Sequence, residues 1–392
     1  MNLARAHRLL VTVATVATVA TVATAATAAT APTAPTAPTA ATALTALTAL
    51  TAATARTAAT AQGVVHDPFP VRLSFTGDIN LGTRTLKEGI PPDSGRGLLA
   101  GVASLLSGDL VIGNFEGVLS DSGRSAKCAP KATRCYAFAT PTWLATRLVE
   151  AGFTHANLAN NHANDYGQTW RAHTEATLRQ LGLTPYGPLD EIAITAVRQG
   201  ERMTLVGVIG FSTYPHAYNL LDPACSAAIV DSVRPLVDVL VVTFHGGSEG
   251  ARAVRTPSGP EFLGGEPRGS LRRWARAVID AGADAVVGHG PHVLRGVEFY
   301  RARPIFYSLG NFLTYRGFNL NGALGLTTVL SLELNGDGSF VSARMPPLVQ
   351  RAGTGPVPDP KRRAIALLRR VTRLDFPETG ASIGGDGAIT PP

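Results

Sequence analysis

The first 66 positions contain no acidic residue, and residues 9–55 contain no charged side chain at all. This stretch is built almost wholly from Ala, Thr and Val, then Pro and Leu, and much of it repeats with a period of three. So simple a sequence cannot encode a packed core, and its Pro-containing part cannot be one continuous helix. We therefore confine globular structure to residues 63–392, which suffice for one large domain or two small ones.

The start of the chain has the parts of an export signal. Arg5 and Arg8 precede an uncharged stretch, and small-residue triplets such as Ala23-Thr24-Ala25 follow. The 23 residues from Leu9 to Ala31 are also long enough for one membrane span. We interpret residues 1–31 as a signal peptide or membrane anchor, and residues 32–62 as a low-complexity Ala/Thr/Pro spacer. Because positive charge stays inside, we expect an extracytoplasmic body, secreted or anchored by this N-terminal segment.

Cysteine is scarce, with three residues in the whole chain. No C-x-x-C pattern occurs, so a structural zinc knot is not indicated. Cys128 and Cys135 lie close together in KCAPKATRC and could bridge a small loop, which would fit an oxidising compartment and leave Cys225 unpaired. Two free, buried thiols are the alternative.

Lysine is scarce too, because Arg supplies most of the basic residues. The net charge is +7, but Arg5, Arg8 and Arg56 precede the body, whose 32 basic and 28 acidic residues give only +4. No run of basic residues is interleaved with aromatic ones. We therefore expect no binding to nucleic acid.

Short apolar runs alternate with helical patterns in the body, which predicts an α/β fold. The expected strands are 71–76, 110–112, 154–158, 203–209, 239–244, 285–287 and 305–309, with a late antiparallel strand at 326–334. The expected helices are 141–151, 168–181 and 270–281, and an amphipathic helix at 361–373 precedes a Gly- and Pro-rich tail. Within that tail, FPETG resembles a cell-wall sorting pentapeptide. It lacks the hydrophobic segment and basic end that such a signal needs.

Polar residues follow the expected strands directly, in the motifs TGDIN, GNFEG, LANNH, HGG and GHGPH. In open α/β folds, ligands collect at the carboxyl ends of strands, so these five motifs predict one composite site. His, carboxylate and amide side chains together suit Mn, Zn or Fe. Pairs of such ions are a usual device for phosphoryl hydrolysis.

The order of these motifs resembles that of the CapA family, the bacterial capsule or poly-γ-glutamate synthesis proteins of the calcineurin-like metallophosphoesterase superfamily. The matching stretches, from about Leu73 to Leu313, are FTGDINLG, GNFEG, LANNHANDYG, VVTFHGG and GADAVVGHGPHVLRGVEFYRARPIFYSLGNFL. The resemblance implies a calcineurin-like α/β fold, with a central β-sandwich flanked by helices. We assign residues 63–352 to this CapA-like metallophosphoesterase domain and residues 353–392 to a C-terminal helix and flexible tail.

The resemblance also implies a set of ligands for one or two divalent metal ions, Mn or Zn. The implied ligands are Asp78, Asn80, Glu116, Asn161, His245, His289 and His292. Asn80 stands where the wider superfamily has His. Glu116, or alternatively Asn114, stands where the superfamily has a bridging Asp.

Further roles follow from the same resemblance. His162 would be the catalytic residue, as a transition-state donor or general acid. Asn114 and Asn311 are candidate substrate contacts, and Arg84 and Arg295 are weaker candidates for binding an anionic substrate. We expect Asp165 to brace its loop and His155 to be structural.

The implied function is that of an exported, metal-dependent hydrolase acting in capsule or poly-γ-glutamate synthesis or export. Metal-bound hydroxide would attack a phosphoester or carbonyl-type centre in an anionic cell-surface polymer or its intermediates. Membrane-bound polymer synthesis proteins are further expected partners. The alternative is a non-catalytic module that binds or assembles anionic polymer on a metallophosphoesterase scaffold, and the departures at Asn80 and Glu116 favour it.

Overall fold

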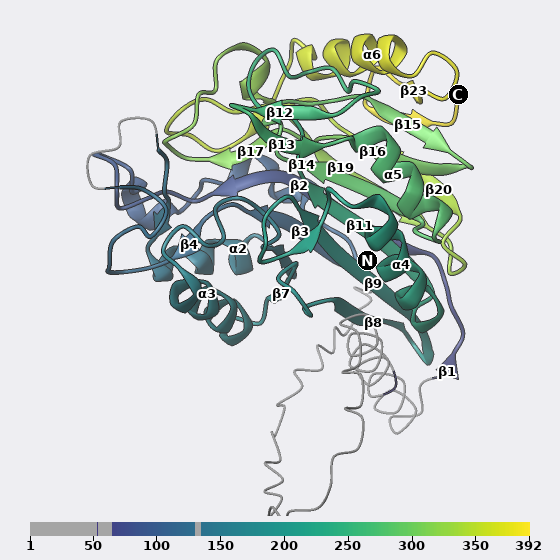
Figure 1. Cartoon of the computed structure of the whole chain (residues 1–392), viewed down its shortest axis with the longest axis horizontal. Helices are drawn as coiled ribbons and strands as arrows, with labels where there is room; N and C mark the ends of the chain where they lie inside the picture. The colour runs from purple at the N-terminus through teal and green to yellow at the C-terminus, as the bar shows by residue number, and fades with distance from the viewer. Residues whose placement is uncertain (1–52, 54–64, 130–134) are drawn as a thin grey trace, which may run out of the picture.

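A computed structural model describes residues 65–129 and 135–392, together with the single position 53. The interpretations of residues 1–31 and of almost all of 32–62 lie outside these ranges. Two β-sheets form the centre of the molecule (Figure 1).

The first sheet has four parallel strands at its centre. Its order is β1 (Val65–His66), β9 (Arg202–Ser212), β11 (Val239–His245), β14 (Ala285–His289), β16 (Arg303–Phe306) and β15 (Val297–Tyr300), with β8 (Ala193–Gln199) and β10 (Tyr218–Asn219) also paired to β9.

The second sheet joins a parallel half to an antiparallel half. Its order is β23 (Ser382–Ile383), β24 (Ala388–Thr390), β20 (Phe340–Arg344), β19 (Val329–Leu334), β2 (Val71–Asn80), β3 (Leu110–Phe115), β6 (His155–Asn157) and β7 (Thr184–Tyr186), with β17 (Asn311–Thr314) also paired to β2. The strand expected at 326–334 lies largely in β19, which is antiparallel to β2 as predicted.

Period-two alternation along the strands places the core. In β11, Val239 and Val241 enter the core shared by the two sheets, whereas Leu240 and Val242 face outward into a second apolar cluster. In β3, Leu110 and Ile112 likewise face the other sheet, and Val111 faces away from it. Both faces of these strands are therefore buried, which is why they read as continuous apolar runs.

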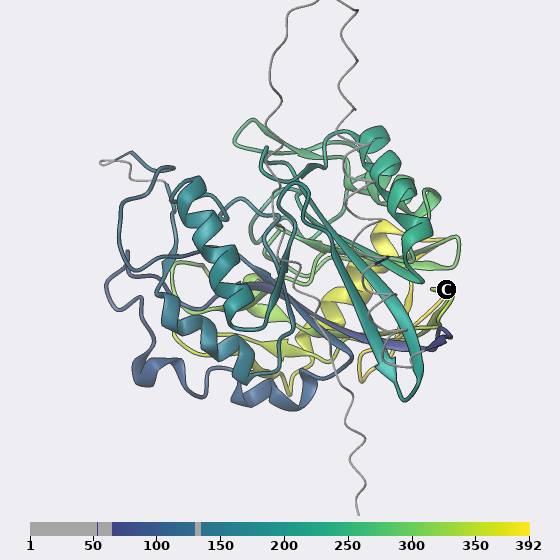
Figure 2. The same cartoon turned by 90° about the horizontal axis from the view of Figure 1, so that it is seen from below.

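Helices cover both outer faces of the sandwich. α4 (Pro223–Val233) and α5 (Leu271–Asp280) pack on the first sheet, and α2 (Thr146–Glu150) and α3 (Gln168–Gln180) pack on the second, on the opposite side (Figure 2). α6 (Arg363–Asp375) adds Ile365, Leu368 and Val371 to the shared core. The predicted α/β class, with a central β-sandwich flanked by helices, is confirmed.

Shorter elements connect these layers. The small strands are β4 (Val118–Leu119), β5 (Ala139–Thr140), β12 (Glu261–Leu263), β13 (Glu266–Gly269), β18 (Leu326–Thr327), β21 (Leu348–Val349) and β22 (Val357–Pro358). Short 3₁₀ helices span Pro92–Gly95, Ala100–Leu105, Thr142–Ala145, Arg234–Leu236 and Gly322–Gly325. The helix expected at 141–151 is thus a 3₁₀ turn followed by α2.

The strand expected at 305–309 ends early, at Phe306, because the chain then turns towards β2. The Gly310 carbonyl oxygen accepts a hydrogen bond from the Asp78 amide at 2.9 Å. A Cβ at position 77 would collide with that oxygen, so only glycine fits there. This close approach fixes the end of β2, where Asp78 lies.

The segment after α6 was expected to be a flexible tail. Instead, β23 and β24 pair with each other and extend the second sheet through β20, because Ile383 and Ile389 bury their side chains in the shared core. Phe376 of the FPETG pentapeptide stacks on Tyr307, and Thr379 donates a hydrogen bond to Glu298. The pentapeptide is therefore built into the fold.

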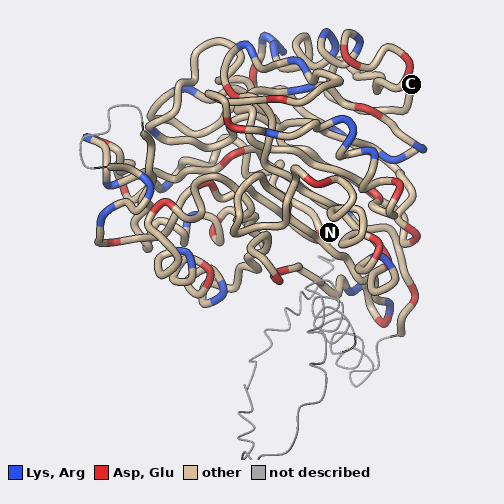
Figure 3. Tube along the Cα trace, in the orientation of Figure 1, with Lys and Arg blue, Asp and Glu red and all other residues tan. Residues whose placement is uncertain are grey.

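The charge distribution and the cysteine pairing of the described residues agree with the sequence. Acidic and basic positions are interspersed over the trace (Figure 3). Cys128 and Cys135 form a disulfide, which is the first of the two alternatives considered for these cysteines, and Cys225 is free and exposed. Among the described residues, no helix combines the length and apolar character needed to cross a bilayer.

Candidate metal centre

The carboxyl ends of the two sheets meet at one rim and bring the sequence motifs together. In the first sheet, His245 and His289 are direct register partners at the ends of β11 and β14. In the second, Asp78 of β2 is the register partner of Asn114 in β3, and Glu116 follows β3 immediately. Parallel strands present their ends on the same side, so residues more than 200 positions apart in sequence converge here.

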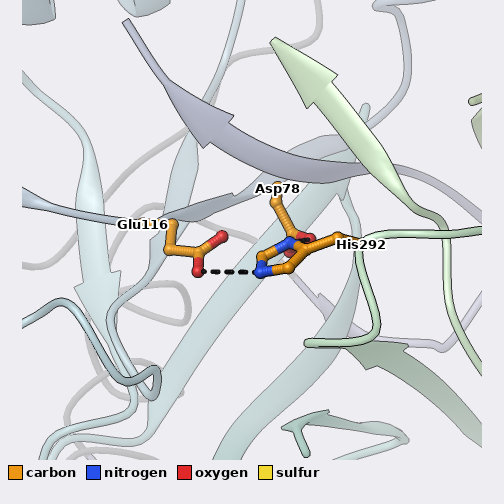
Figure 4. Close-up of side chains that lie close together, drawn as sticks. All are labelled: Asp78, Glu116 and His292. Carbon is orange, nitrogen blue, oxygen red and sulfur yellow. Dashed lines mark hydrogen bonds and ion pairs between the residues drawn. The ribbon is translucent and has the colours of Figure 1, made fainter. Parts of the chain in front are cut away.

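Asp78, Glu116 and His292 form the centre of this cluster (Figure 4). His292 Nδ1 lies 2.9 Å from Asp78 Oδ2, and His292 Nε2 lies 3.7 Å from Glu116 Oε1. One ligand atom from each of the three falls within 4.8 Å of the other two. His289 Nδ1 lies 3.5 Å from the other Asp78 oxygen.

Several buried atoms at this site have no hydrogen-bond partner. They are both carboxylate oxygens of Glu116, Nε2 of His245, Nδ1 of His289 and Oδ1 of Asn311, the register partner of Asp78. Oδ1 of Asn161, the residue before His162, is also buried without a partner. A buried polar atom without a partner costs about 1–3 kcal/mol, so such a concentration needs an explanation. Glu116, His245 and His289 are residues for which the family resemblance implies metal binding, and a mixed N and O donor set suits a divalent cation. The residues present therefore fit a bound metal ion.

Charge is arranged asymmetrically within the cluster. Burial alone would raise the pKa of Asp78, but the hydrogen bond from His292 and the nearby imidazole of His289 outweigh it and hold that pKa well below its usual range. Burial raises the pKa of Glu116 well above its usual range, and the charge of His292 only partly opposes it. One carboxylate is thus stabilised as an anion, while the other lacks compensating positive charge.

The histidines differ in the same way. Burial lowers the pKa of His245 well below its usual range, which keeps a lone pair free for a cation. Burial would also lower the pKa of His292, but the charge of Glu116 and the hydrogen bond that His292 donates to Asp78 raise it to about 10.

His292 adopts a left-handed backbone conformation, with φ of 59°. Such a conformation costs a non-glycine residue about 1–3 kcal/mol and persists where neighbouring contacts enforce it. Asn311 provides such a contact, since its Nδ2 donates to the His292 carbonyl oxygen at 3.2 Å. Asn311 is also the register partner of Asp78. Asn311 thus supports His292, and its predicted contact with substrate stays a prediction.

Asn80 does not belong to the group of unpartnered donor atoms. Its Nδ2 donates to the Glu116 carbonyl oxygen at 3.0 Å, and its Oδ1 accepts from the Gly82 amide at 3.2 Å. Both ends of the side chain therefore hold the backbone, and through its first bond Asn80 positions Glu116. Its assignment as a metal ligand stays a prediction.

Asn114 is likewise engaged within the protein. Its Nδ2 donates to Asp78 Oδ1 at 2.8 Å, and its Oδ1 accepts from Asn157 at 3.0 Å and Asn160 at 3.3 Å. Asn114 is fully buried and orients Asp78, and its predicted contact with substrate stays a prediction.

His162 approaches the cluster from the loop after β6. Its Nδ1 lies 2.7 Å from Asp165 Oδ2, and its Nε2 lies 3.8 Å from Glu116 Oε1. Burial lowers the pKa of His162, and the adjacent Asp165 partly opposes that shift. A neutral imidazole that donates Nδ1–H to Asp165 presents its Nε2 lone pair to the centre.

Three further residues complete the site, although the sequence did not indicate them. Glu249 Oε2 lies 3.8 Å from His292 Nε2. Phe138 and Phe318 stack at 4.9 Å between ring centroids, Phe138 against His162 at 4.4 Å and Phe318 against His292 at 5.3 Å. The aromatic pair thus connects the two histidines at the edge of the cluster.

The two arginines considered for anion binding have structural partners. Arg295 is buried and forms a bidentate ion pair with Glu261, at 2.9 and 2.7 Å. Arg84 donates to the carbonyl oxygens of Ser120 and Gly123. None of these bonds joins either guanidinium to a residue of the cluster.

Comparison with known proteins assigns the chain to a family. The family described as "Bacterial capsule synthesis protein PGA_cap" matches residues 72–316, more than half of the chain. The chain therefore belongs to this family, which agrees with the resemblance seen in its motifs.

Individual relatives carry related names. The chain is 28% identical to "PGA biosynthesis protein CapA" of Bacillus subtilis, over 76% of this chain and 77% of that protein. It is 29% identical to "Capsule biosynthesis protein CapA" of Bacillus anthracis, over 64% of this chain and 61% of that protein. Among solved structures, NAD nucleotidase (NadN) of Haemophilus influenzae matches 77% of this chain and 56% of its own at 12% identity and a TM-score of 0.37, a likeness too slight for any conclusion.

Proposed function

We propose that this protein is an exported, metal-dependent hydrolase that acts on an anionic capsule polymer, such as poly-γ-glutamate, or on its intermediates. The observation that carries the proposal is the convergence of unpaired, buried donor atoms from Glu116, His245 and His289 beside the Asp78–His292 pair. Family membership and the names of the relatives support a capsule polymer as the proposed substrate.

The proposed cation, Asp78 and His162 have different chemical roles. A divalent cation bound by this donor set supplies Lewis acidity and positive charge for a substrate anion. Asp78 stays ionised, held by Asn114 and His292. His162 Nε2 is the atom that accepts a proton from water at the centre and returns it to the departing oxygen.

The test is hydrolysis of a chromogenic phosphodiester or phosphomonoester by the full chain, purified without chelators and supplied with Mn²⁺ or Zn²⁺. His289→Ala is the test variant, and His173→Ala, which removes an exposed histidine on α3, is its matched control. We expect the first to lower kcat/KM by about 10²-fold or more and the second to leave it unchanged. Equal, slow hydrolysis by both variants and the parent would refute the enzymatic proposal.

The alternative function is non-catalytic handling of anionic polymer on the same scaffold. The observation in its favour is Asn80, which stands at a superfamily ligand position and is engaged by backbone groups. Binding of poly-γ-glutamate that survives chelation, together with absent hydrolysis, would select this alternative. Binding lost on chelation would favour the metal-dependent site.

Export and a cell-surface partner are parts of the same proposal. The Cys128–Cys135 disulfide supports an oxidising compartment, and the N-terminal sequence has the composition of an export signal. We propose membrane-bound polymer synthesis proteins as partners outside the cytoplasm. Fractionation of cells followed by alkylation of free thiols tests this, because the exported protein should carry one free thiol, at Cys225.

A further inference from the structure

The Cys128–Cys135 disulfide closes a short loop whose two flanks both hold Asp165, the partner of His162. The described flanks are residues 125–128 and 135–138. Neither flank belongs to a helix, and only the β5 strand that follows the second joins a sheet. Their contacts with Asp165 are therefore set by loop conformation.

The first flank holds the backbone of Asp165 and one of its carboxylate oxygens. The Ala126 amide and the Ser125 hydroxyl each donate to the Asp165 carbonyl oxygen at 2.9 Å. Lys127 Nζ lies 3.1 Å from Asp165 Oδ1 and donates to the Asn161 carbonyl oxygen at 3.2 Å. Lys127 thus connects the Asp165 carboxylate to the backbone of a proposed ligand residue.

The second flank holds the other oxygen. The Phe138 amide donates to Asp165 Oδ2 at 2.8 Å, the same atom that lies 2.7 Å from His162 Nδ1. The Phe138 ring packs on the imidazole of His162. Both the carboxylate and the ring that it orients are therefore fixed from this side.

We propose that the Cys128–Cys135 disulfide and Lys127 act as a positioning clamp, which holds Asp165 and thereby aims His162 Nε2 at the metal centre. The proposal deepens the proposed function, on which its kinetic part rests. Lys127 holds Asp165 and its Nζ also lies 3.3 Å from His162 Nδ1, on the side of the ring away from Nε2. Lys127 and the cystine are therefore positioning groups that do not touch the reacting atoms. A disulfide that only stabilised the fold would not need both of its flanks to contact Asp165.

The test compares the full chain carrying Cys225→Ser with a variant that also carries Cys128→Ser and Cys135→Ser. Cys225→Ser removes the exposed free thiol and prevents exchange, so it serves as the matched control. Treatment of the control protein with a phosphine supplies the two electrons and, with water, the protons that turn the cystine into two thiols and the phosphine into its oxide. Lys127→Met breaks the ion pair while keeping the disulfide, and Lys127→Arg should restore function.

Four quantities are measured on each protein: bound metal, kcat, KM for the chromogenic phosphodiester, and the Nδ1–H resonance of His162 in protein labelled with ¹⁵N-histidine. His162→Gln identifies that resonance. We expect the serine variant, the reduced protein and Lys127→Met to keep their metal and their KM. We also expect them to lose kcat by roughly 10- to 100-fold and to lose the protected resonance. Lys127→Arg should recover most of both.

The outcomes separate this proposal from the function on which it rests. If no protein hydrolyses substrate, the proposed function fails, and the His162 resonance alone decides the clamp. Retention of that resonance and of kcat within two-fold in both the reduced protein and Lys127→Met overturns the clamp. Loss of metal together with the disulfide overturns it too, because the cystine would then support the whole centre. If the serine variant does not fold, reduction and Lys127→Met still decide.

Discussion

Glu116 and Asn80 touch each other, yet their side chains have opposite surroundings. The Asn80 side chain has a partner at each end, whereas neither carboxylate oxygen of Glu116 has any. The polar atoms of Asn80 are thus satisfied by backbone groups, whereas Glu116 Oε1 has only imidazole nitrogens at 3.7–3.9 Å. This contrast separates Asn80, which supports the site through backbone hydrogen bonds, from Glu116, whose carboxylate oxygens are free to bind a cation.

The contrast predicts different losses when each side chain is changed. Mn²⁺ or Zn²⁺ at 100 times its Kd should stabilise the parent protein by about 2.7 kcal/mol. Glu116→Gln should abolish that increase, because it replaces a carboxylate donor. Asn80→Ala should keep the increase and lower the free energy of unfolding by about 1–2 kcal/mol through its lost hydrogen bonds. Thermal unfolding with and without metal measures both, and loss of metal binding only in Asn80→Ala would contradict the assignment.

His155 predicts a pH dependence away from the metal centre. It is buried, its ring nitrogens lie 2.8 Å from the hydroxyls of Thr154 and of Thr195 in the other sheet, and burial lowers its pKa from 6.5 to about 3. The unfolded chain therefore binds the proton more readily between these values. The contribution to stability is complete above about pH 6.5 and decreases as pH falls towards 3, by at most about 1.4 kcal/mol per pH unit.

His155→Gln should remove this contribution, so the unfolding free energies of parent and variant should converge as the pH is lowered from 7 to 4. Denaturant titrations at several pH values provide the measurement. His173→Gln controls for the loss of an exposed imidazole. Parallel curves for the parent and His155→Gln would show that the buried ring is not the source of the slope.

At the residue scale, the sequence predicted which polar residues lie together better than it predicted the residues that support them. Asp78, Glu116 and His292 follow apolar strands in recognisable motifs, so their convergence could be expected from the rule on strand ends. Phe318 and Glu249 could not, since their positions depend on how loops fold back over the rim. Asp165 had a usable signal, because it stands three residues after His162 in NNHANDYG and the intervening loop is a single turn.

Among the elements, strands were easier to predict than the helix α4 and the C-terminal strands. α4 has a capping signal, with Asp222 accepting from the amides of Ala224 and Cys225, and Pro223 in the first turn. Its interior is rich in Ala and Ser, so apolar periodicity is weak. The strands β23 and β24 are two and three residues long and separated by glycines, which gives no pattern to recognise.

The end of α6 provides a test at this scale. Phe376 is 2% exposed, stacks on Tyr307 at 5.0 Å and lies under the Arg272 guanidinium at 4.5 Å, whereas Leu374 is 51% exposed. Phe376→Ala should lower the free energy of unfolding by about 3–5 kcal/mol, because it leaves a cavity. Leu374→Ala, the matched control, should cost less than about 1 kcal/mol. Equal effects in denaturant unfolding would mean that the pentapeptide does not pack as described.

On the scale of the whole molecule, each sheet supplies only part of the candidate centre. The second sheet brings Asp78 and Glu116, and the first brings His245 and His289. The shared core between the sheets holds the two halves in register, since residues from both enter one apolar cluster. A cation bound by residues of both sheets should therefore stabilise the fold globally.

The most direct test of this account is anomalous scattering from a crystal of the protein purified without chelators and supplied with Mn²⁺ or Zn²⁺. The account predicts a peak between the two sheets, at coordination distances of about 2.0–2.2 Å from Asp78, Glu116 and the histidines of both sheets. A metal-free centre at saturating ion, or a peak bound elsewhere with these donor atoms still unpaired, would contradict it.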